Sequence, residues 1–271
     1  MANENPRNDG EYLSTLARGL SVLRSFTKER PEMSLSEVAQ ATSLSPAVAR
    51  RCLNTLVHLG YVGKKGRRFL LTPEVIGFAS AFLESMNVEG VVRPYLQEVR
   101  DKTGDSSSLA VLSAQNILYL VHVSTNRMVR LAAGVGTRFP AYATSLGRVL
   151  LAHQDDALLE DLLGAMRPEK FTDKTVTSIP ALRRILRKVR SQGYASIQDE
   201  LDYGIVSVAV PVRIDDGTVV AAINCSTATT RVKESEMVET RLPTLRQAAA
   251  KIEAELRRYP ILVHSIRGAA G

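Results

Sequence analysis

The side chains best suited to binding chemistry lie between Ser45 and Leu71, where six arginines and lysines accompany a regular apolar stripe. Arg50, Arg51 and Asn54 stand out within this stretch. An arginine can form two parallel hydrogen bonds to guanine, an asparagine can do the same with adenine, and arginine and lysine bind phosphate. The stretch therefore forms either a surface that binds a polyanion or an ordinary amphipathic helix with a solvated basic face.

A helical wheel of about 100° per residue separates two faces of the helix that carries these side chains. The predicted apolar face, which can pack on other helices, consists of Val48, Cys52, Leu56 and Leu59. The predicted opposite face consists of Ala47, Arg50, Arg51, Asn54 and His58. The small side chain of Ala47 would allow this face to approach a partner closely.

Two helices are predicted ahead of the basic helix. Residues Tyr12–Phe26 carry leucines at helical spacing, which predicts the first helix. The second is a short helix over Leu35–Ala41, and Ser34 with Glu37 three residues later forms the sequence pattern of a capping box. A three-residue turn at Thr42–Leu44 then leads to the basic helix.

The basic helix and the segment after it complete the pattern. Ser45 is predicted to cap the helix, Pro46 suits its first position, and Gly60 suits its end. The residues Tyr61–Leu71 then predict a hairpin with a basic tip. This order of elements predicts a winged helix-turn-helix, whose third helix enters the major groove while the wing reaches phosphates or the minor groove. We expect DNA contacts from Ser34, Ser36, Ser45, Ala47, Arg50, Arg51, Asn54, Lys64, Lys65 and Arg67, with Arg68 also on the wing.

The distribution of charge supports nucleic-acid binding. The chain has a net charge of +7, and ten basic residues accompany only three acidic ones between Tyr12 and Thr72. The remainder of the chain is nearly neutral, as expected for a nucleic-acid-binding module joined to a different kind of domain. The helix predicted at Ile179–Gln192 is also basic, but it lacks a helix-turn-helix context and is interpreted as solvated. A nonspecific architectural DNA-binding protein remains an alternative.

The second part of the chain mixes strands and helices after a linker helix that begins at Pro73 and runs to about Met86. Antiparallel hairpins with flanking helices predict an α+β domain. The Asp216–Gly217 step suits a tight turn between two strands. The predicted elements are strands within 107–124 with a turn near 115–116, a strand at 128–134, a helix from 144, a helix over 179–193, a hairpin over 207–227 and a helix over about 237–258.

Residues that could catalyse a reaction lack partners in the sequence. Ser145 is not in a G-x-S-x-G motif, and Cys225 lies in an apolar strand without a histidine nearby. The acids Asp199, Glu200 and Asp202 fit a solvated loop or an internal cap better than a metal site. The four histidines show no ligand spacing. We therefore expect no catalytic residue, no metal and no cofactor.

A small-molecule pocket fits this domain better. The segment Thr144–Gly147 opens a helix, where free amides and the helix dipole favour a carboxylate. Asn224 and Ser226 are two residues apart and share one face of a strand, as do Ser207 and Ala209 on the partner strand. A few polar groups among apolar walls predict a site for a small carboxylic acid. Each residue alone would also fit a helix cap or a satisfied polar group.

Several separated motifs resemble one known family. They are "TLARGLSVLRSF", "LSEVAQATSLSPAVARRCLNTLVHLGYV", "ATSLGRVLLA", "DELDYGIVSVAVPV" and "VVAAINCS". Together they resemble the IclR family of bacterial transcription regulators, from about Glu11 to Arg258. The segments "ELDYG" and "RLPTLRQAA" are most similar to the branch that controls catabolism of protocatechuate, 4-hydroxybenzoate and β-ketoadipate.

The resemblance implies a winged helix-turn-helix joined by a linker helix to a GAF-like α/β effector-binding domain. The expected segments are a flexible tail at 1–11, the DNA-binding domain at 12–72, the linker helix at 73–88, the effector-binding domain at 89–263 and a tail at 264–271. It also implies promoter DNA as a partner and a homodimer or a dimer of dimers. No apolar run approaches the roughly 20 residues of a membrane span, and the amino-terminal residues lack the apolar region of a secretory signal. We therefore expect a soluble cytoplasmic protein without a membrane partner.

The resemblance further implies which residues bind the effector. They are Ser145, Leu146, Gly147, Ser207, Asn224 and Ser226. Some family members have an acidic ligand contact where this chain has Ile197. This difference disfavours an effector like glyoxylate or pyruvate and favours the protocatechuate, 4-hydroxybenzoate or β-ketoadipate class. Regulation of another carboxylate pathway, or a ligand-binding enzyme with an incidental basic domain, remains an alternative.

Overall fold

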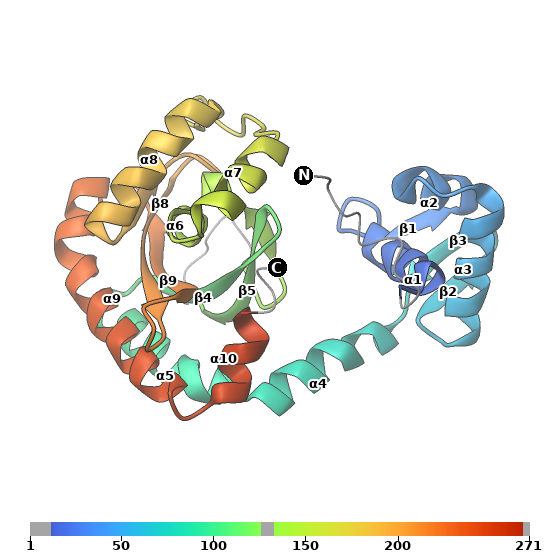
Figure 1. The fold of residues 1–271 in the computed structure, drawn as a ribbon, viewed down its shortest axis with the longest axis horizontal. Helices are drawn as coiled ribbons and strands as arrows, with labels where there is room; N and C mark the ends of the chain where they lie inside the picture. Colours follow the sequence, from blue (N-terminus) through green and yellow to red (C-terminus); the bar gives the residue numbers. More distant parts are fainter. Residues whose placement is uncertain (1–11, 126–132, 268–271) are drawn as a thin grey trace. The chain divides into compact units, whose positions relative to one another are not determined.

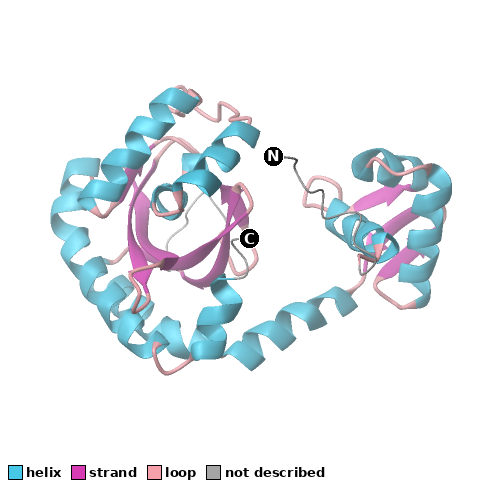
Figure 2. Ribbon diagram, viewed as in Figure 1, coloured by secondary structure: helices cyan, strands magenta, loops and turns pink. Residues whose placement is uncertain are grey.

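The computed structural model describes residues 12–125 and 133–267, which form two compact units that meet in sequence between Phe82 and Leu83 (Figure 1). Unit 1 ends at Phe82 and unit 2 begins at Leu83. The tail expected at residues 1–11 and most of the strand expected at 128–134 lie outside the described residues. Each unit has its own secondary structure, and Figure 2 distinguishes the helices from the strands.

The helices of unit 1 follow the sequence prediction closely. They are α1 at Ser14–Ser25, α2 at Leu35–Thr42 and α3 at Pro46–His58. The predicted capping box is present, because Ser34 Oγ accepts from the Glu37 amide at 3.3 Å and the Glu37 carboxylate accepts from the Ser34 amide at 2.6 Å. These local hydrogen bonds fix the start of α2 and thereby the position of the turn before α3.

The strands of unit 1 form a three-stranded antiparallel sheet. Its strands are β1 at Glu32–Ser34, β2 at Val62–Lys65 and β3 at Arg68–Leu71, in the order β1-β3-β2. The hairpin of β2 and β3 confirms the predicted wing, and Gly66 at its tip has a φ of +61°. Strand β1 was not predicted, because three residues are too few to show an alternating pattern.

The core of unit 1 corrects part of the predicted apolar face of α3. Cys52 and Leu56 are buried as expected and the half-buried Val48 packs against the core, but Leu59 is 57% exposed. Leu59 has a helical backbone and lines the same apolar hollow as Val48, Cys52 and Leu56, so the wheel gives its face correctly but not its exposure. The buried positions of α3 that the wheel did not select are Ala49 and Leu53.

The linker is not one continuous helix. Thr72 caps a short 3₁₀ turn at Pro73–Val75, and α4 follows at Ile76–Met86. Asn87 has a left-handed backbone with a φ of 49°, which ends α4 before α5 starts at Val88. The 3₁₀ turn and the break at Asn87 therefore replace the single helix predicted over this region.

The linker helices bear on the membrane question. Within residues 12–125 and 133–267, no single helix has both the length and the apolar character needed to cross a membrane. Residues Pro73–Met86 and Val88–Thr103 meet that criterion only when they are taken together, and the chain bends by 77° between them.

The sheet of unit 2 confirms the predicted α+β class. Six strands pair antiparallel in the order β6-β5-β4-β9-β8-β7. Gly217 has a φ of +82° in the turn between β8 and β9, as the Asp216–Gly217 step predicted. The strands are β4 at Ser106–Ser113, β5 at Asn116–Val123, β6 at Arg138–Pro140, β7 at Ala195–Gln198, β8 at Ile205–Arg213 and β9 at Val219–Ala228.

Helices cover both faces of this sheet (Figure 1). Helices α5 and α9 pack together on one face, while α6 packs on the other with α8 against it. The predicted helices α6, α8 and α9 are present; α5, α7, α10, β6 and β7 were not predicted. Helix α10 includes residues 264–267, where a tail was expected. The helices are α5 at Val88–Thr103, α6 at Ser145–Ala152, α7 at Asp156–Ala165, α8 at Ile179–Gln192, α9 at Glu234–Leu256 and α10 at Pro260–Arg267.

Candidate nucleic-acid interface and ligand pocket

Helix α3 and the wing present exposed cations. In the part of unit 1 that the structure describes, ion pairs form only around Arg68. Among residues 12–125 and 133–267, no carboxylate lies within ion-pair distance of the other cations of α3 and the wing, which are Arg50, Arg51, Lys64, Lys65 and Arg67. Their charge is therefore available to a polyanion, which is the requirement for a DNA phosphate contact.

Arg68 differs from the other wing residues. Its guanidinium lies 2.9 Å from the Glu32 carboxylate and 3.6 Å from the Glu37 carboxylate, and it also donates to the Glu32 carbonyl oxygen. The pairing of β1 with β3 brings these groups together. Arg68 therefore joins the wing to β1 and α2, and its predicted contact with DNA stays a prediction.

The other predicted DNA contacts lie on the surface of unit 1. Ser34 is half-buried, and the remaining nine residues are exposed. Ser34 and Ser45 cap α2 and α3, where their hydroxyl oxygens accept from backbone amides. A capping hydroxyl still has its proton and can donate it to a phosphate. Ser36 is exposed in the first turn of α2, and Ala47 and Asn54 are exposed on α3.

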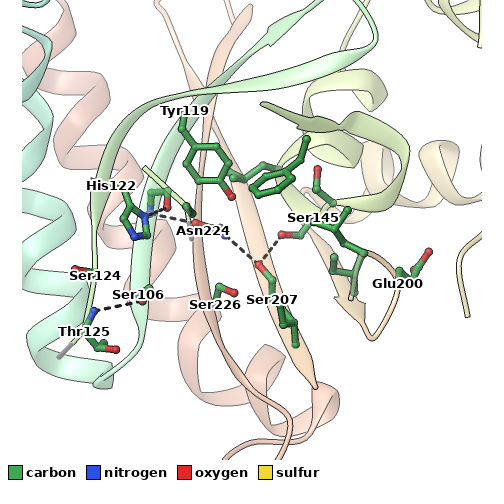
Figure 3. Close-up of a pocket in the computed structure, with 18 residues that line it drawn as sticks. Ser106, Tyr119, His122, Ser124, Thr125, Ser145, Glu200, Ser207, Asn224 and Ser226 are labelled. Atoms are coloured by element: carbon green, nitrogen blue, oxygen red, sulfur yellow. Dashed lines mark hydrogen bonds between the residues drawn. The ribbon is translucent and has the colours of Figure 1, made fainter. Parts of the chain in front are cut away.

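Unit 2 contains a cavity of about 210 Å³ beside the amino end of α6 (Figure 3). Strands β4, β5, β8 and β9 contribute side chains to its walls. Of the six predicted effector contacts, five line this cavity: Ser145, Leu146, Ser207, Asn224 and Ser226. The fold therefore brings together residues that are up to about eighty positions apart in the chain.

Gly147 does not line the cavity, and its predicted effector contact stays a prediction. Its amide donates to Thr144 Oγ1 at 3.0 Å. A Cβ atom at this position would lie closer than 3.0 Å to the Ala141 backbone. The glycine therefore lets the 3₁₀ turn at Ala141–Ala143 contact α6, which fixes the amino end of the helix beside the cavity.

The polar character of the cavity comes from one end of the sheet face beneath α6. Along β4 this face carries Ala110 and Leu112 in the core and Ser106 and Ser108 toward the cavity. Strand pairing places Ser108 opposite Asn224 and Ser106 opposite Ser226. The alternation of a β-strand thus continues from an apolar core into a polar wall on the same face.

A directed hydrogen-bond network connects this wall to α6 (Figure 3). Ser207 Oγ donates to the Cys225 carbonyl oxygen at 2.9 Å and accepts from Asn224 Nδ2 at 3.1 Å. Because the single Ser207 proton is engaged, Ser145 Oγ must donate to Ser207 Oγ across 2.7 Å. Asn224 Oδ1 in turn accepts from the Ser108 amide at 3.1 Å. The network holds the amino end of α6 against β8 and β9.

The amino end of α6 can bind an anion. Ser145 and Leu146 are the first two residues of α6, so their amides have no carbonyl partner within the helix. Both residues line the cavity, and the helix dipole adds positive potential there. A carboxylate in the cavity would therefore find hydrogen-bond donors at this end.

A buried ion pair lies next to this site. The Arg148 guanidinium donates to both Glu200 carboxylate oxygens, at 2.6 and 2.5 Å, and its Nε donates to the Tyr142 carbonyl oxygen. Glu200 is 8% exposed and contributes to the cavity wall. The sequence left two interpretations open for the acids Asp199, Glu200 and Asp202, a solvated loop or an internal cap. Glu200 is buried, and Asp199 forms an internal cap by accepting from the Gly204 amide at 2.7 Å.

Tyr119 and His122 on β5 also line the cavity, although no pattern in the sequence pairs them. They are three residues apart, and simple alternation places such residues on opposite faces. The pairing of β4 with β5 shifts between Leu109 and Ala110, which makes Leu120 an extra residue in β5. This β-bulge turns Tyr119 and His122 to the same face. Their rings lie edge to face, 6.2 Å apart.

Cys225 behaves as a buried apolar side chain. Burial raises the pKa of its thiol to about 12, so the thiolate is not available as a nucleophile at neutral pH. In the described part of the chain, no group of three or more His, Cys, Asp or Glu side chains could hold a metal ion.

A winged helix-turn-helix with unpaired cations, followed by an α/β unit with a small buried pocket, defines a ligand-responsive, DNA-binding regulator of transcription. The comparison with known families agrees. Residues 15–66 match the IclR helix-turn-helix domain, and residues 80–254 match the carboxy-terminal domain of bacterial transcriptional regulators of the IclR type. The chain belongs to the IclR family of bacterial transcription regulators.

Three relatives illustrate the similarity. The Pca regulon regulatory protein of Pseudomonas putida is 35% identical over 242 residues, which cover 89% of this chain and 83% of the relative. The p-hydroxybenzoate hydroxylase transcriptional activator of Acinetobacter baylyi is 31% identical, with coverages of 89% and 91%. The crystal structure of an IclR homolog from Microbacterium hydrocarbonoxydans, complexed with 4-hydroxybenzoate, has a TM-score of 0.73 and 28% identity, with coverages of 90% and 100%.

Proposed function

We propose that this regulator binds operator DNA through α3 and the wing and responds to a carboxylic acid of aromatic catabolism bound in the cavity of unit 2. The observation that carries the proposal is the cavity itself, with the free amides of Ser145 and Leu146 at one end. The relatives named for the Pca regulon and for p-hydroxybenzoate hydroxylase, and the 4-hydroxybenzoate-bound structure, support an aromatic acid or its β-ketoadipate product. The protein acts by binding, without a catalytic step, on chromosomal DNA in the cytoplasm.

The effector acts by shifting an equilibrium. A ligand changes DNA binding only if its affinity differs between the DNA-binding and the non-binding arrangement of the protein. The Ser145–Ser207–Asn224 network joins the pocket wall to α6, and the Arg148–Glu200 pair joins α6 to the loop after β7. A carboxylate bound to the α6 amides would therefore stabilise one arrangement of α6, β8 and that loop.

We propose that the regulator is a homodimer or a dimer of dimers. Unit 1 has an apolar surface formed by Leu13, Leu16, Leu20, Leu59 and Phe78, all at least 46% exposed. These residues line a hollow of about 690 Å³, and no residue of α4 is buried. A second copy would cover this surface, and two copies would present two reading helices to two half-sites. Sedimentation of the full chain measures the assembly; a monomer at micromolar concentration would contradict it.

Substitutions in unit 1 distinguish residues that recognise operator bases from residues that bind the DNA backbone. Arg50→Ala or Asn54→Ala is expected to weaken operator binding by about 1–3 kcal/mol while changing binding to scrambled DNA little, because these side chains would meet base edges. Lys65→Ala is expected to weaken binding to both duplexes alike and to lower the salt dependence by about one phosphate contact. Fluorescence anisotropy at several salt concentrations measures both effects.

Arg187 provides the control for charge alone. It is an exposed arginine on α8 in unit 2, a basic helix that has no helix-turn-helix context. Arg187→Ala removes the same charge as Arg50→Ala and is expected to leave operator affinity unchanged. If all three cation variants lost operator affinity equally, net charge rather than α3 and the wing would account for DNA binding.

A substitution that fills the pocket tests the effector site. Ser145→Trp places a large side chain at the amino end of α6, so binding of 4-hydroxybenzoate and of benzoate is expected to fall below detection. DNA affinity without effector should remain, because Ser145 belongs to unit 2. Titration calorimetry measures the first quantity and anisotropy the second. Unchanged affinity for every carboxylic acid that the native protein binds would place the effector elsewhere.

A further inference from the structure

Tyr119 is a buried polar side chain of the cavity, and its hydroxyl has no hydrogen-bond partner in the part of the chain that the structure describes. The residue is only 7% exposed. The hydroxyl of Tyr142, by contrast, binds both the amide and the carbonyl oxygen of Glu169. Figure 3 shows the Tyr119 hydroxyl directed into the pocket, toward the side where Ser145, Ser207 and Asn224 lie. An unpaired hydroxyl is costly at such a position unless a ligand or water binds it.

We propose that Tyr119 binds a ring hydroxyl of the effector, which makes hydroxylated benzoates the ligand class of this pocket. The inference rests on the proposed function, because it assumes that the carboxylate lies at the amino end of α6. Burial raises the pKa of the Tyr119 hydroxyl, so it stays protonated and can donate as well as accept. A phenolic hydroxyl offers the complementary acceptor and donor.

The arrangement of the walls suits a flat, rigid acid. Tyr119 comes from β5 and Ser207 from β8, and β4 and β9 lie between these strands. Three strand spacings of about 4.8 Å separate the two backbones by roughly 14 Å along the sheet. The Tyr119 side chain extends across part of that width. A molecule with polar groups at both ends of a planar ring would connect the α6 amides to the Tyr119 hydroxyl.

Between these two ends the sheet side of the cavity is polar, because β4 and β9 carry Ser108 and Asn224 there, and the other walls are apolar. Phe139 lies edge-on to the Tyr119 ring at 5.8 Å, and Ile197, Leu201 and Ile205 complete the wall. Aromatic rings favour such edge contacts with a further ring. The cavity volume of about 210 Å³ is below the roughly 300–1,000 Å³ of drug-sized sites, so a single ring is the appropriate size.

His122 gives the same end of the cavity a second polar group. Its Nδ1 lies 2.9 Å from Ser108 Oγ, and its ring contacts that of Tyr119. Burial, together with the nearby Arg93 charge, lowers the pKa of His122, so the ring is neutral at pH 7 and can both donate and accept. A second ring hydroxyl, beside the one bound by Tyr119, would meet His122. A linear oxo acid offers no ring hydroxyl to either residue.

The test removes only the Tyr119 hydroxyl. Native protein and Tyr119→Phe are titrated by calorimetry with 4-hydroxybenzoate, 3,4-dihydroxybenzoate, benzoate and β-ketoadipate. The native protein should bind the hydroxylated benzoates most tightly. Tyr119→Phe should lose about 3- to 10-fold in affinity for them and nothing for benzoate, since one hydrogen bond disappears. Its thermal unfolding temperature without ligand should stay the same or rise, because no partner in the protein is lost.

Tyr142→Phe is the matched control. Tyr142 is a buried tyrosine of the same unit that does not line the cavity. This variant should unfold at a lower temperature and keep its affinity for 4-hydroxybenzoate, the reverse of Tyr119→Phe. Equal losses for benzoate and 4-hydroxybenzoate in Tyr119→Phe, no loss, or tightest native binding of β-ketoadipate would overturn the inference. Ser145→Trp would still decide separately whether the cavity is the effector site.

Discussion

Replacing Arg148 with alanine is expected to lower the free energy of unfolding of unit 2 by about 3–5 kcal/mol. Arg148 is 3% exposed, and its guanidinium binds both carboxylate oxygens of Glu200. The substitution leaves the Glu200 carboxylate buried without its counter-ion and removes a donor from the Tyr142 carbonyl oxygen. Urea denaturation followed by circular dichroism measures the loss.

Two control variants distinguish the effect of burying the Arg148–Glu200 ion pair from the effect of removing a charge. Arg183→Ala breaks the exposed pair with Glu160, which lies at 2.5 Å, and is expected to cost much less than Arg148→Ala because water screens an exposed pair. The double variant Arg148→Met, Glu200→Leu removes both buried charges and should regain most of the stability that Arg148→Ala loses. If Arg148→Ala and Arg183→Ala cost the same, the first pair would not be buried in solution.

Gly147→Ala is expected to destabilise unit 2 by about 3 kcal/mol, toward the upper end of what overpacking usually costs. The added Cβ would overlap the backbone of Ala141, which cannot rotate away as a flexible side chain could. Either the 3₁₀ turn at Ala141–Ala143 or α6 must move. Effector affinity should therefore fall as well, although Gly147 does not line the cavity. Thermal unfolding and calorimetry measure the two effects.

Gly164→Ala is the control for a glycine in a helix. A Cβ atom at Gly164 in α7 would meet nothing within 4 Å. Alanine is the better helix former, so this variant should gain about 0.5–1 kcal/mol. A Gly147→Ala variant as stable as native protein would show that the contact between Ala141 and α6 relaxes without cost.

The sequence predicted unit 1 well because local interactions determine most of it. Ser34 with Glu37, and Ser45 with Pro46, mark the starts of α2 and α3 within a few residues. The features of unit 1 that the sequence did not reveal include contacts between residues distant in the chain. Arg68 is neutralised by Glu32, which strand pairing brings close, and that pairing could not be deduced from a three-residue strand.

The pocket was predictable where strand alternation is regular and where a helix begins, as at Ser145 and Leu146. Asn224, Ser226 and Ser207 could be placed on one face, and the structure confirms that they line one cavity. Glu200 could not be placed, because its burial depends on Arg148, which is 52 residues away in the chain. Gly147 belongs to the same motif as Ser145 and Leu146, but its role depends on the space beside Ala141, which no motif reveals.

Because Leu120 is an extra residue in β5, the spacing of Tyr119 and His122 along the chain differs from their spacing in the sheet. Deleting Leu120 would leave Tyr119 and His122 two residues apart, so regular alternation would keep both side chains on the pocket face without a bulge. Two proteins with this sheet can therefore present the same two pocket side chains from strands of different length. When regulators of this kind are compared, their pocket residues have to be matched by strand pairing, because spacing along the chain also counts the bulged residue.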